Sequence, residues 1–349
     1  MPTSDEALSA KACRGARMFR ALIFAVFSLF VCAPRPVLSQ AAAPITITSG
    51  SPAGGTYDAT ARLLARHLPR FLSGTPQVIV KNAPAAGGLV ALNQLYNSAP
   101  RDGTALAVVD GALVLEAFFG NPGARFDPRK FNWVGSRARE TPLCAAWSSR
   151  SVKTIQEAIQ HEVIVGAVGG ARTDHVPHML NALIGTKFKV VTGYPGSSEL
   201  IGALENGEIN GICGWSWTTI KRRVPDWVSD NKISLLVQTG FSKAIDIPDV
   251  PLALDLSAEG KQRQVMRLLI SDTQIASPLV ASPGLPDQKI VETRNAFDAA
   301  MKDPQLHADA QQQQIDLDPT SGLELHALID QMYSLPTETA QAAQNILHR

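Results

Sequence analysis

The stretch Ser51-Pro52-Ala53-Gly54-Gly55-Thr56-Tyr57-Asp58 follows a short apolar run from Ile45 to Thr48. This order predicts a strand, a glycine turn and then a helix. The same order returns further along the chain, where an apolar run precedes Asn82-Ala83-Pro84-Ala85-Ala86-Gly87-Gly88 and an apolar-periodic segment follows. Two such units in succession predict an α/β fold with neighbouring parallel strands.

The two glycine turns are candidates for anion binding. Turns at the carboxyl ends of strands expose backbone N–H groups at helix N-termini, where those groups and the helix dipole favour negative charge. We therefore expect Gly54, Gly55, Gly87 and Gly88 to contact a ligand, although each could instead only shape its turn. Asp58 is expected to contact the ligand directly or through water, or only to stabilise the first helical turn. This pattern favours binding a carboxylate over transforming one.

The N-terminus predicts export. A basic segment, residues 11–20, precedes an apolar run, residues 21–31, that is shorter than the roughly 20 residues needed to span a bilayer. Small residues near Ala41 predict cleavage after it, so residues 1–41 are expected to be a signal peptide that directs the protein to the periplasm. The remaining chain is nearly neutral, which argues against nucleic-acid partners.

Two of the four cysteines, Cys144 and Cys213, lie in the predicted mature chain. An oxidising compartment allows a disulfide between them but does not require one. Because each lies in an apolar, strand-like run, the pattern favours two buried free thiols, with a bridge as the alternative. Neither cysteine has metal-ligand spacing around it.

The rest of the chain alternates strand-like and helix-like runs, which predicts mostly parallel sheets. The predicted mature chain of about 300 residues exceeds one comfortable core, so we expect two lobes. The first would comprise residues 42–141 and 272–349, with the C-terminal helices packed on it, and the second residues 142–271. The expected strands are Ile45–Thr48, Gln77–Lys81, Ala105–Val109, Asn132–Ser136, Leu143–Trp147, Val163–Val168, Phe188–Thr192, Ile209–Cys213 and Ile233–Gln238.

Further short motifs follow the two turns in a fixed order. They are Ala99 to Thr104 (APRDGT), Gly193 to Gly196 (GYPG), Leu204 to Ile209 (LENGEI) and Ile247 to Pro251 (IPDVP). Together with the two glycine turns, they resemble the periplasmic receptor proteins of tripartite tricarboxylate transporters over nearly the whole mature chain. The resemblance implies a two-lobed periplasmic-binding fold, type 2 like, that closes on a small organic acid like a Venus flytrap.

The resemblance also implies which loops hold the carboxylate. Backbone amides of the first loop would do so from one lobe, and those of the loop Gly166 to His175 from the other, often through water. The chain departs from the family pattern at Arg172 and Asp174. The ligand contacts expected from these loops and from the Gly193 to Gly196 motif are Ala53, Thr56, Gly169, Gly170, Arg172, Thr173 and Tyr194.

Other side chains near these loops have two possible roles. Arg172 could offer a bidentate fork to a carboxylate or pair with Asp174 in solvent. Thr173 fits a helix N-cap and could also face the ligand. Of Trp215 and Trp217, one is expected in the core and the other stacked on a flat ligand, with Ser216 as a polar contact.

We therefore expect a solute receptor that delivers a small organic acid to membrane subunits of a transporter. We expect it to be a monomer without enzyme activity or cofactor. No catalytic triad or phosphate-binding motif can be assembled. His175 and His178 have a metal-compatible spacing, but no third ligand is evident, so no metal site is expected. A periplasmic sensor that feeds a two-component system and a secreted hydrolase are the alternatives.

Overall fold

The computed structural model describes residues 42–149, 151–169 and 171–347. The predicted signal peptide, residues 1–41, and the candidate ligand contact Gly170 lie outside the described residues. Within the described ranges, no helix is both long enough and apolar enough to cross a membrane.

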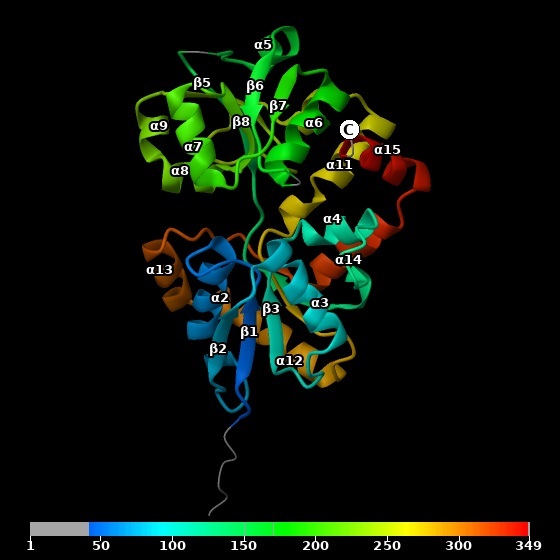
Figure 1. Ribbon diagram of the computed structural model, residues 1–349. Coiled ribbons are helices and arrows are strands. Elements are labelled where there is room, and N and C mark those ends of the chain that lie inside the picture. Colours follow the sequence, from blue (N-terminus) through cyan, green and yellow to red (C-terminus); the bar gives the residue numbers. More distant parts are fainter. Residues whose placement is uncertain (1–41, 150, 170, 348–349) are drawn as a thin grey trace, which may run out of the picture. The chain divides into compact units, whose positions relative to one another are not determined.

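Two separate sheets organise the chain (Figure 1). The six-stranded sheet, in the order β11-β4-β10-β3-β1-β2, belongs to what we call the first lobe, and the five-stranded sheet, in the order β7-β6-β8-β5-β9, to the second. The strands are β1 (Ile45–Ser49), β2 (Val78–Asn82), β3 (Ala105–Val108), β4 (Asn132–Ser136), β5 (Pro142–Trp147), β6 (Val163–Gly166), β7 (Phe188–Val191), β8 (Gly211–Ser216), β9 (Ile233–Gln238), β10 (Pro278–Ala281) and β11 (Thr320–Ser321).

The sheets are mixed, so the prediction of mostly parallel sheets is wrong. β1 is parallel to β2 and β3, and β6 is parallel to β7 and β8, as βα units require. β10 is antiparallel to β3 and β4, and β5 is antiparallel to β8 and β9. β5 and β10 are the first strands after the chain passes from one sheet to the other. Each therefore enters its sheet from the end opposite to the one where the parallel strands begin.

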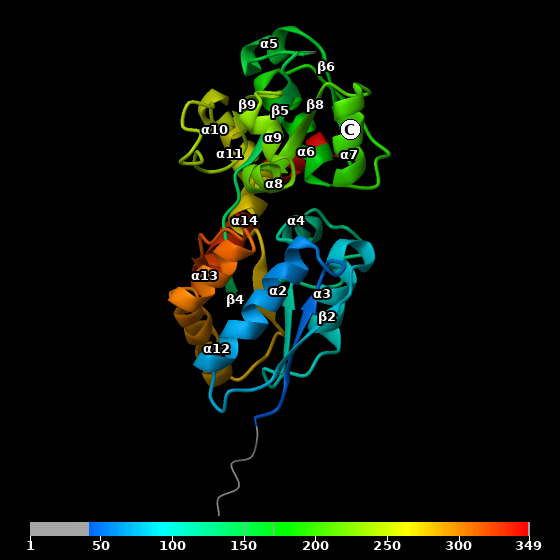
Figure 2. The same ribbon diagram turned by 90° about the vertical axis from the view of Figure 1, so that its left-hand side faces the viewer.

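Helices cover the first sheet (Figure 2). α2 packs on β1 and β2 and is contacted by α13, while α12 and α14 pack on β4. α2 buries Leu63 and Leu64 completely and carries Asp58 in its first turn, where a carboxylate suits the helix dipole. The segments are α2 (Thr56–His67), η1 (Leu68–Phe71), η2 (Ala85–Gly88), α3 (Leu89–Asn97), α4 (Leu113–Phe118), η3 (Pro128–Lys130), α12 (Asp287–Ala300), α13 (Pro304–Gln312) and α14 (Gly322–Tyr333).

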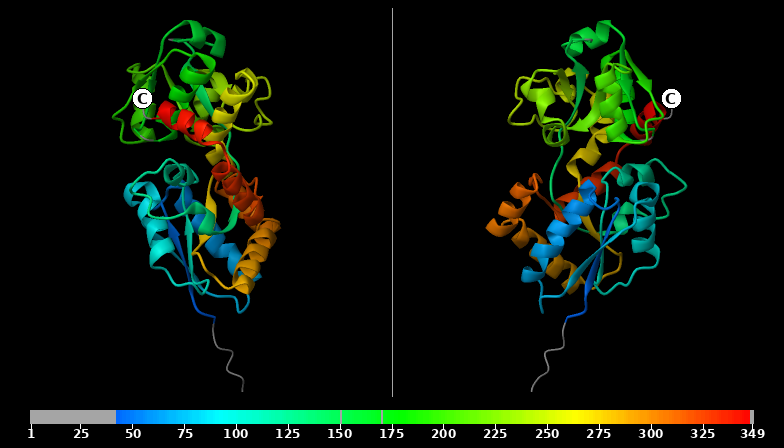
Figure 3. Two further views of the ribbon diagram at one scale, coloured as in Figure 1. Left: turned by 90° about the vertical axis from the view of Figure 1, so that its right-hand side faces the viewer. Right: turned by 60° about the vertical axis from the view of Figure 1, so that its left-hand side comes forward.

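The last helix does not stay with the first sheet. α15 packs on α11 and α6, beside the second sheet, and Figure 3 shows it next to α11. The lobe boundaries at residues 141 and 271 stay a prediction, but the expected packing of the C-terminal helices holds only for α12 to α14. The remaining segments are α5 (Ile155–Gln160), α6 (Arg172–Ile184), α7 (Ser197–Asn206), α8 (Trp217–Arg223), α9 (Pro225–Ser229), α10 (Ala253–Leu256), α11 (Lys261–Leu269), η4 (Ser271–Gln274) and α15 (Thr337–Leu347).

The mature cysteines are bonded. Cys144 in β5 and Cys213 in β8 form a disulfide, so the expectation of two free thiols is wrong. The two strands are antiparallel neighbours, and both cysteines lie at the shift in register between the pairs Leu143–Trp215 and Ala145–Ile212. Both cysteines are completely buried, as the apolar runs around them predict.

Candidate functional site

The carboxyl ends of the parallel strands carry the loops of the candidate site. In the first lobe these are the loops after β1, β2 and β3, and in the second lobe the loop after β6. Ligands of open α/β sheets bind at the carboxyl ends of the strands. Two pockets adjoin these loops. The large pocket has a volume of about 670 Å³ and the small pocket about 40 Å³. Residues of both lobes line each of them.

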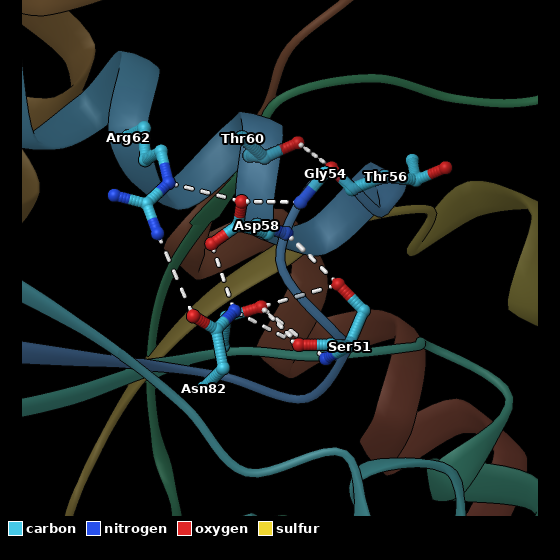
Figure 4. Close-up of polar contacts among 8 residues, drawn as sticks. Ser51, Gly54, Thr56, Asp58, Thr60, Arg62 and Asn82 are labelled. Carbon is cyan, nitrogen blue, oxygen red and sulfur yellow. Dashed lines mark hydrogen bonds and ion pairs between the residues drawn. The ribbon is translucent and has the colours of Figure 1, made fainter.

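Asp58 holds the first loop in shape (Figure 4). Its buried carboxylate accepts hydrogen bonds from the Gly54 amide (2.8 Å), from Asn82 Nδ2 (2.8 Å) and from Arg62 Nε (2.9 Å). Burial raises the pKa of Asp58, but these hydrogen bonds outweigh it and hold the pKa below its ordinary value. The side chain joins the first loop to the second glycine turn, and its predicted contact with the ligand stays a prediction.

Both glycine amides of the first loop have partners. The Gly54 N–H donates to Asp58, and the Gly55 N–H donates to the Pro52 carbonyl (3.0 Å). Gly54 has a positive φ of 80°, whereas Gly55 is extended with a φ of −74°. Gly55 is required for space instead, because a Cβ there would lie 2.7 Å from Ser51 Oγ.

Other amides of the first loop, on either side of the two glycines, are free of acceptors among the described residues. The Ser51 hydroxyl accepts the Asp58 amide (3.0 Å), and the Gly55 carbonyl accepts the Ala59 amide (2.9 Å). Within the described part of the chain, no acceptor meets the amides of Ala53, Thr56 and Tyr57. Thr56 is exposed and lines the small pocket. Unsatisfied N–H groups therefore remain at the N-terminus of α2, as the strand–turn–helix pattern predicts.

The second glycine turn packs against the first loop. A Cβ on Gly88 would lie 3.0 Å from the Gly50 Cα, so the two backbones touch. Gly88 is buried, with a φ of 96°. Gly87 is exposed and lines the large pocket together with Ala86. Gly88 therefore positions the loops, and of the two glycines only Gly87 faces a pocket.

The second-lobe loop begins α6. The Thr173 hydroxyl accepts a hydrogen bond from the Val168 amide (3.0 Å), which closes the loop. No described residue accepts the amides of Arg172 and Thr173, the first two of α6. Gly169 and Arg172 line the large pocket, whereas Thr173 is buried beside it.

Arg172 is engaged in ion pairs. Its guanidinium contacts Glu140 Oε2 (2.6 Å) and Asp272 Oδ2 (2.7 Å) rather than Asp174. Burial opposes the charge on Arg172, but the two carboxylates outweigh it and hold its pKa well above the ordinary value. The two carboxylates come from the segments that connect β4 to β5 and α11 to β10, and the Glu140 amide donates to the Thr273 carbonyl (2.8 Å). We call Arg172, Glu140 and Asp272 the triad.

The small pocket is rich in arginine. Arg137 is buried and is held by neutral acceptors: the hydroxyls of Thr60 and Ser277 and the Asp316 carbonyl. Burial lowers the pKa of Arg137. Ser216 lines this pocket, at the start of α8, as does Glu140 of the triad.

The tryptophans belong to the core of the second lobe. Trp215 is 6% exposed and stacks on Trp227, with ring centroids 6.4 Å apart. Trp217 is equally buried, and its indole N–H donates to the Asp246 carboxylate (2.9 Å). Neither ring lines either pocket. Tyr194 is half-buried against the same core. Its pKa is raised mainly by burial and, to a smaller extent, by the negative charge of Glu208.

Asp110 and Glu116 are pocket residues that no motif indicated. Both line the large pocket, as do Asp272 and His175. Asp110 follows β3 by two residues, so its place near a strand's carboxyl end was an available signal. Burial lowers the pKa of His175, which favours its neutral form. Among the described ranges, no group of three or more His, Cys, Asp or Glu residues could hold a metal ion.

The sequence of this chain is similar to those of known proteins. A family model described as "Tripartite tricarboxylate transporter family receptor" matches residues 60–333. A UPF0065 protein from Cupriavidus necator, named for the gbd 5' region, is 28% identical over 273 residues, which cover 75% of each chain.

Several solved structures share the fold. A TctC solute-binding protein from Polaromonas superposes with a TM-score of 0.67 at 17% identity, covering 88% of this chain and 98% of that one. MatC from Rhodopseudomonas palustris, solved with malate, gives 0.59 at 19% identity and 90% and 100% coverage. An R. palustris protein solved with adipate gives 0.63 at 18% identity and 86% and 97% coverage.

Proposed function

The chain belongs to the tripartite tricarboxylate transporter receptor family, and we propose that it binds a small organic acid in the periplasm and delivers it to the membrane subunits of a transporter. The observation that carries this proposal is the pair of unsatisfied amides, Thr56 and Tyr57, at the start of α2. The relatives solved with malate and adipate support an acid as the ligand.

The carboxylate would sit at these amides for two reasons. They are donors with no protein acceptor among the described residues, and they lie at the positive end of a 12-residue helix. The Asp58 network fixes their direction before any ligand arrives, so less ordering is needed on binding. The amides of Arg172 and Thr173 offer the same chemistry from the second lobe.

Transport would then depend on closure. A ligand that touches loops of both lobes binds their closed arrangement more strongly, and so shifts the population toward it. The membrane subunits would recognise that arrangement. We place the protein in the periplasm with a mature chain that starts near Ala42, and N-terminal sequencing of the exported protein tests this start.

A single substitution tests the amide assignment. Thr56 is the first residue of α2, where proline is tolerated, and Gly55 before it has the extended backbone that a following proline requires. Thr56→Pro removes the N–H and keeps the helix intact. Thr56→Ala removes the side chain and keeps the N–H, so it is the matched control.

We expect a clear difference between the two variants. Malate and adipate are the first acids of a thermal-shift screen, and titration calorimetry then gives the affinity of whichever acid binds. Thr56→Pro should weaken binding about 10- to 100-fold, the value of one charged hydrogen bond, while Thr56→Ala stays close to the wild type. Equal affinity in the two variants would refute the assignment of this amide.

A further inference from the structure

The large pocket carries an excess of negative charge. Three carboxylates line it, those of Asp110, Glu116 and Asp272, against one guanidinium, that of Arg172. A pocket that accepts organic acids would be expected to carry the opposite balance, because like charges repel inside a low-dielectric site. This excess therefore needs an explanation from the ligand.

Arg172 forms no ion pair with the other two lining carboxylates, although Asp110 lies close enough to help raise its pKa, after Asp272 and Glu140. It forms ion pairs with Asp272 and with Glu140, so the triad as a whole keeps a formal charge of −1. Because burial lowers the pKa of His175, this side chain contributes no full positive charge at neutral pH. The negative charge of Asp110 and Glu116 thus remains.

Asp110 and Glu116 have neutral partners. Asp110 Oδ1 accepts a hydrogen bond from the Ala112 amide (2.9 Å). The Asp110 carboxylate also contacts Tyr57, whose pKa is raised mainly by burial and next by the charge of Asp110. Glu116 Oε2 accepts a hydrogen bond from Asn121 Nδ2 (2.7 Å). Along the described ranges, no Lys, Arg or His nitrogen lies within 4.0 Å of either carboxylate. Each carboxylate is thus held in place by neutral donors and keeps its capacity for a cation.

Apolar side chains fill the space between the charged ones. Leu89, Leu113, Phe119, Met179 and Ile270 all line the same pocket. An ammonium group that binds here exchanges water for carboxylates, and its carbon chain gains apolar contacts. A bare inorganic cation has no carbon chain and would gain nothing from these apolar side chains.

We propose that the ligand carries a cationic nitrogen as well as its carboxylate, so that it is an amino acid in the broad sense, with the ammonium facing Asp110 and Glu116. This inference rests on the proposed function, in which free backbone amides hold the carboxylate end; Arg172, at the start of α6, lines the same pocket as Asp110 and Glu116. A second carboxylate in the large pocket would meet Asp110 and Glu116. Dicarboxylates are therefore disfavoured as ligands of this chain.

Matched acids test the charge requirement directly. The probes are pentanoate, 5-aminopentanoate and pentanedioate, together with phenylalanine against 3-phenylpropanoate and leucine against 4-methylpentanoate. Bound ligand is first removed by unfolding and refolding the protein. In calorimetry, at least one aminated acid should bind ten or more times more tightly than its partner without nitrogen, which corresponds to about 1.4 kcal/mol.

Two isosteric variants locate the effect. Asp110→Asn keeps an acceptor for the Ala112 amide, and Glu116→Gln keeps one for Asn121. Each should reduce the preference for the aminated acid about threefold, and the double variant should lose a tenfold preference altogether. Asp255→Asn is the control, because Asp255 is exposed on α10 and lines neither pocket.

The outcomes separate this inference from the proposed function. If acids bind but the nitrogen-free or dicarboxylate probe of every set binds as tightly as the aminated one, the inference is overturned and the receptor assignment stands. An aminated preference that survives in the double variant also overturns it, because the cation would then bind elsewhere. If no acid binds and only an uncharged solute does, the proposed function itself fails.

Discussion

At the scale of single residues, Asp58 shows how a candidate ligand contact can also hold the site in shape. Its two oxygens accept hydrogen bonds from the first loop, from Asn82 at the end of β2 and from Arg62 one turn along α2. Arg62 is about half exposed, so its ion pair contributes little, and the buried amide contacts carry the interaction. The orientation of the Thr56 and Tyr57 amides therefore depends on Asp58.

We predict that Asp58→Asn lowers the free energy of unfolding by about 1–3 kcal/mol at pH 7, because one oxygen becomes a donor that faces other donors. The pKa of Asp58 is lowered in the folded state, so its stabilisation is present above the ordinary value near 4. It is lost as the pH falls through the folded pKa. Urea unfolding at pH 7 and pH 3 checks this.

The pH dependence is the specific part of that test. The difference between wild type and Asp58→Asn should be smaller at pH 3 than at pH 7, whereas a difference that stays constant would point to a steric effect. Asp255→Asn, at an exposed position of α10, should show no difference from the wild type at either pH.

At the scale of elements, sequence patterns predict strands well and their pairing poorly. β4 and β9 have the bounds expected from the sequence, since a short apolar run is a local signal. The direction and register of neighbours depend on residues far away in the chain. The Cys144–Cys213 bond is an example, because it follows from the antiparallel register of β5 and β8.

We predict that this disulfide stabilises the second lobe substantially. Its cysteines are 69 residues apart, and closing a loop of this length in the unfolded chain is worth roughly 4 kcal/mol. The double variant Cys144→Ala, Cys213→Ala should therefore unfold at a clearly lower urea concentration. Reduction of the wild type should reproduce most of this loss, and an unchanged midpoint in both cases would show that the bond adds no stability.

At the scale of the whole molecule, the site could be predicted only in outline. The glycine turns were visible because a loop at a strand end has a local signature, and the structure leaves free amides beside the first of them. No sequence pattern predicted the pocket charges of Asp110 and Glu116, or the ion pairs of the triad. Arg172 and Asp272 lie 100 residues apart, and no spacing rule links them. Trp215 looked like a ligand contact because its strand position is right, but Trp227 covers it.

The triad lies where the chain passes between the two sheets, so it is the best place to test how the lobes depend on each other. Glu140 belongs to the segment after β4 and Asp272 to the one before β10, and Arg172 begins α6. Removing the cation alone leaves two neighbouring carboxylates, of which Asp272 is buried with 5% of its side chain exposed. Such a loss is more costly than removing all the charges together.

We therefore predict that Arg172→Met lowers the free energy of unfolding by about 3 kcal/mol, which is the lower end of the cost of breaking a buried ion pair. The triple variant Arg172→Met, Glu140→Gln, Asp272→Asn should recover more than half of this loss, because no unpaired charge then remains. Urea unfolding of the wild type, Arg172→Met and the triple variant measures both the loss and its recovery. A triple variant no more stable than Arg172→Met would show that Arg172 acts through its packing, and that the charges of the triad do not stabilise the crossing segments.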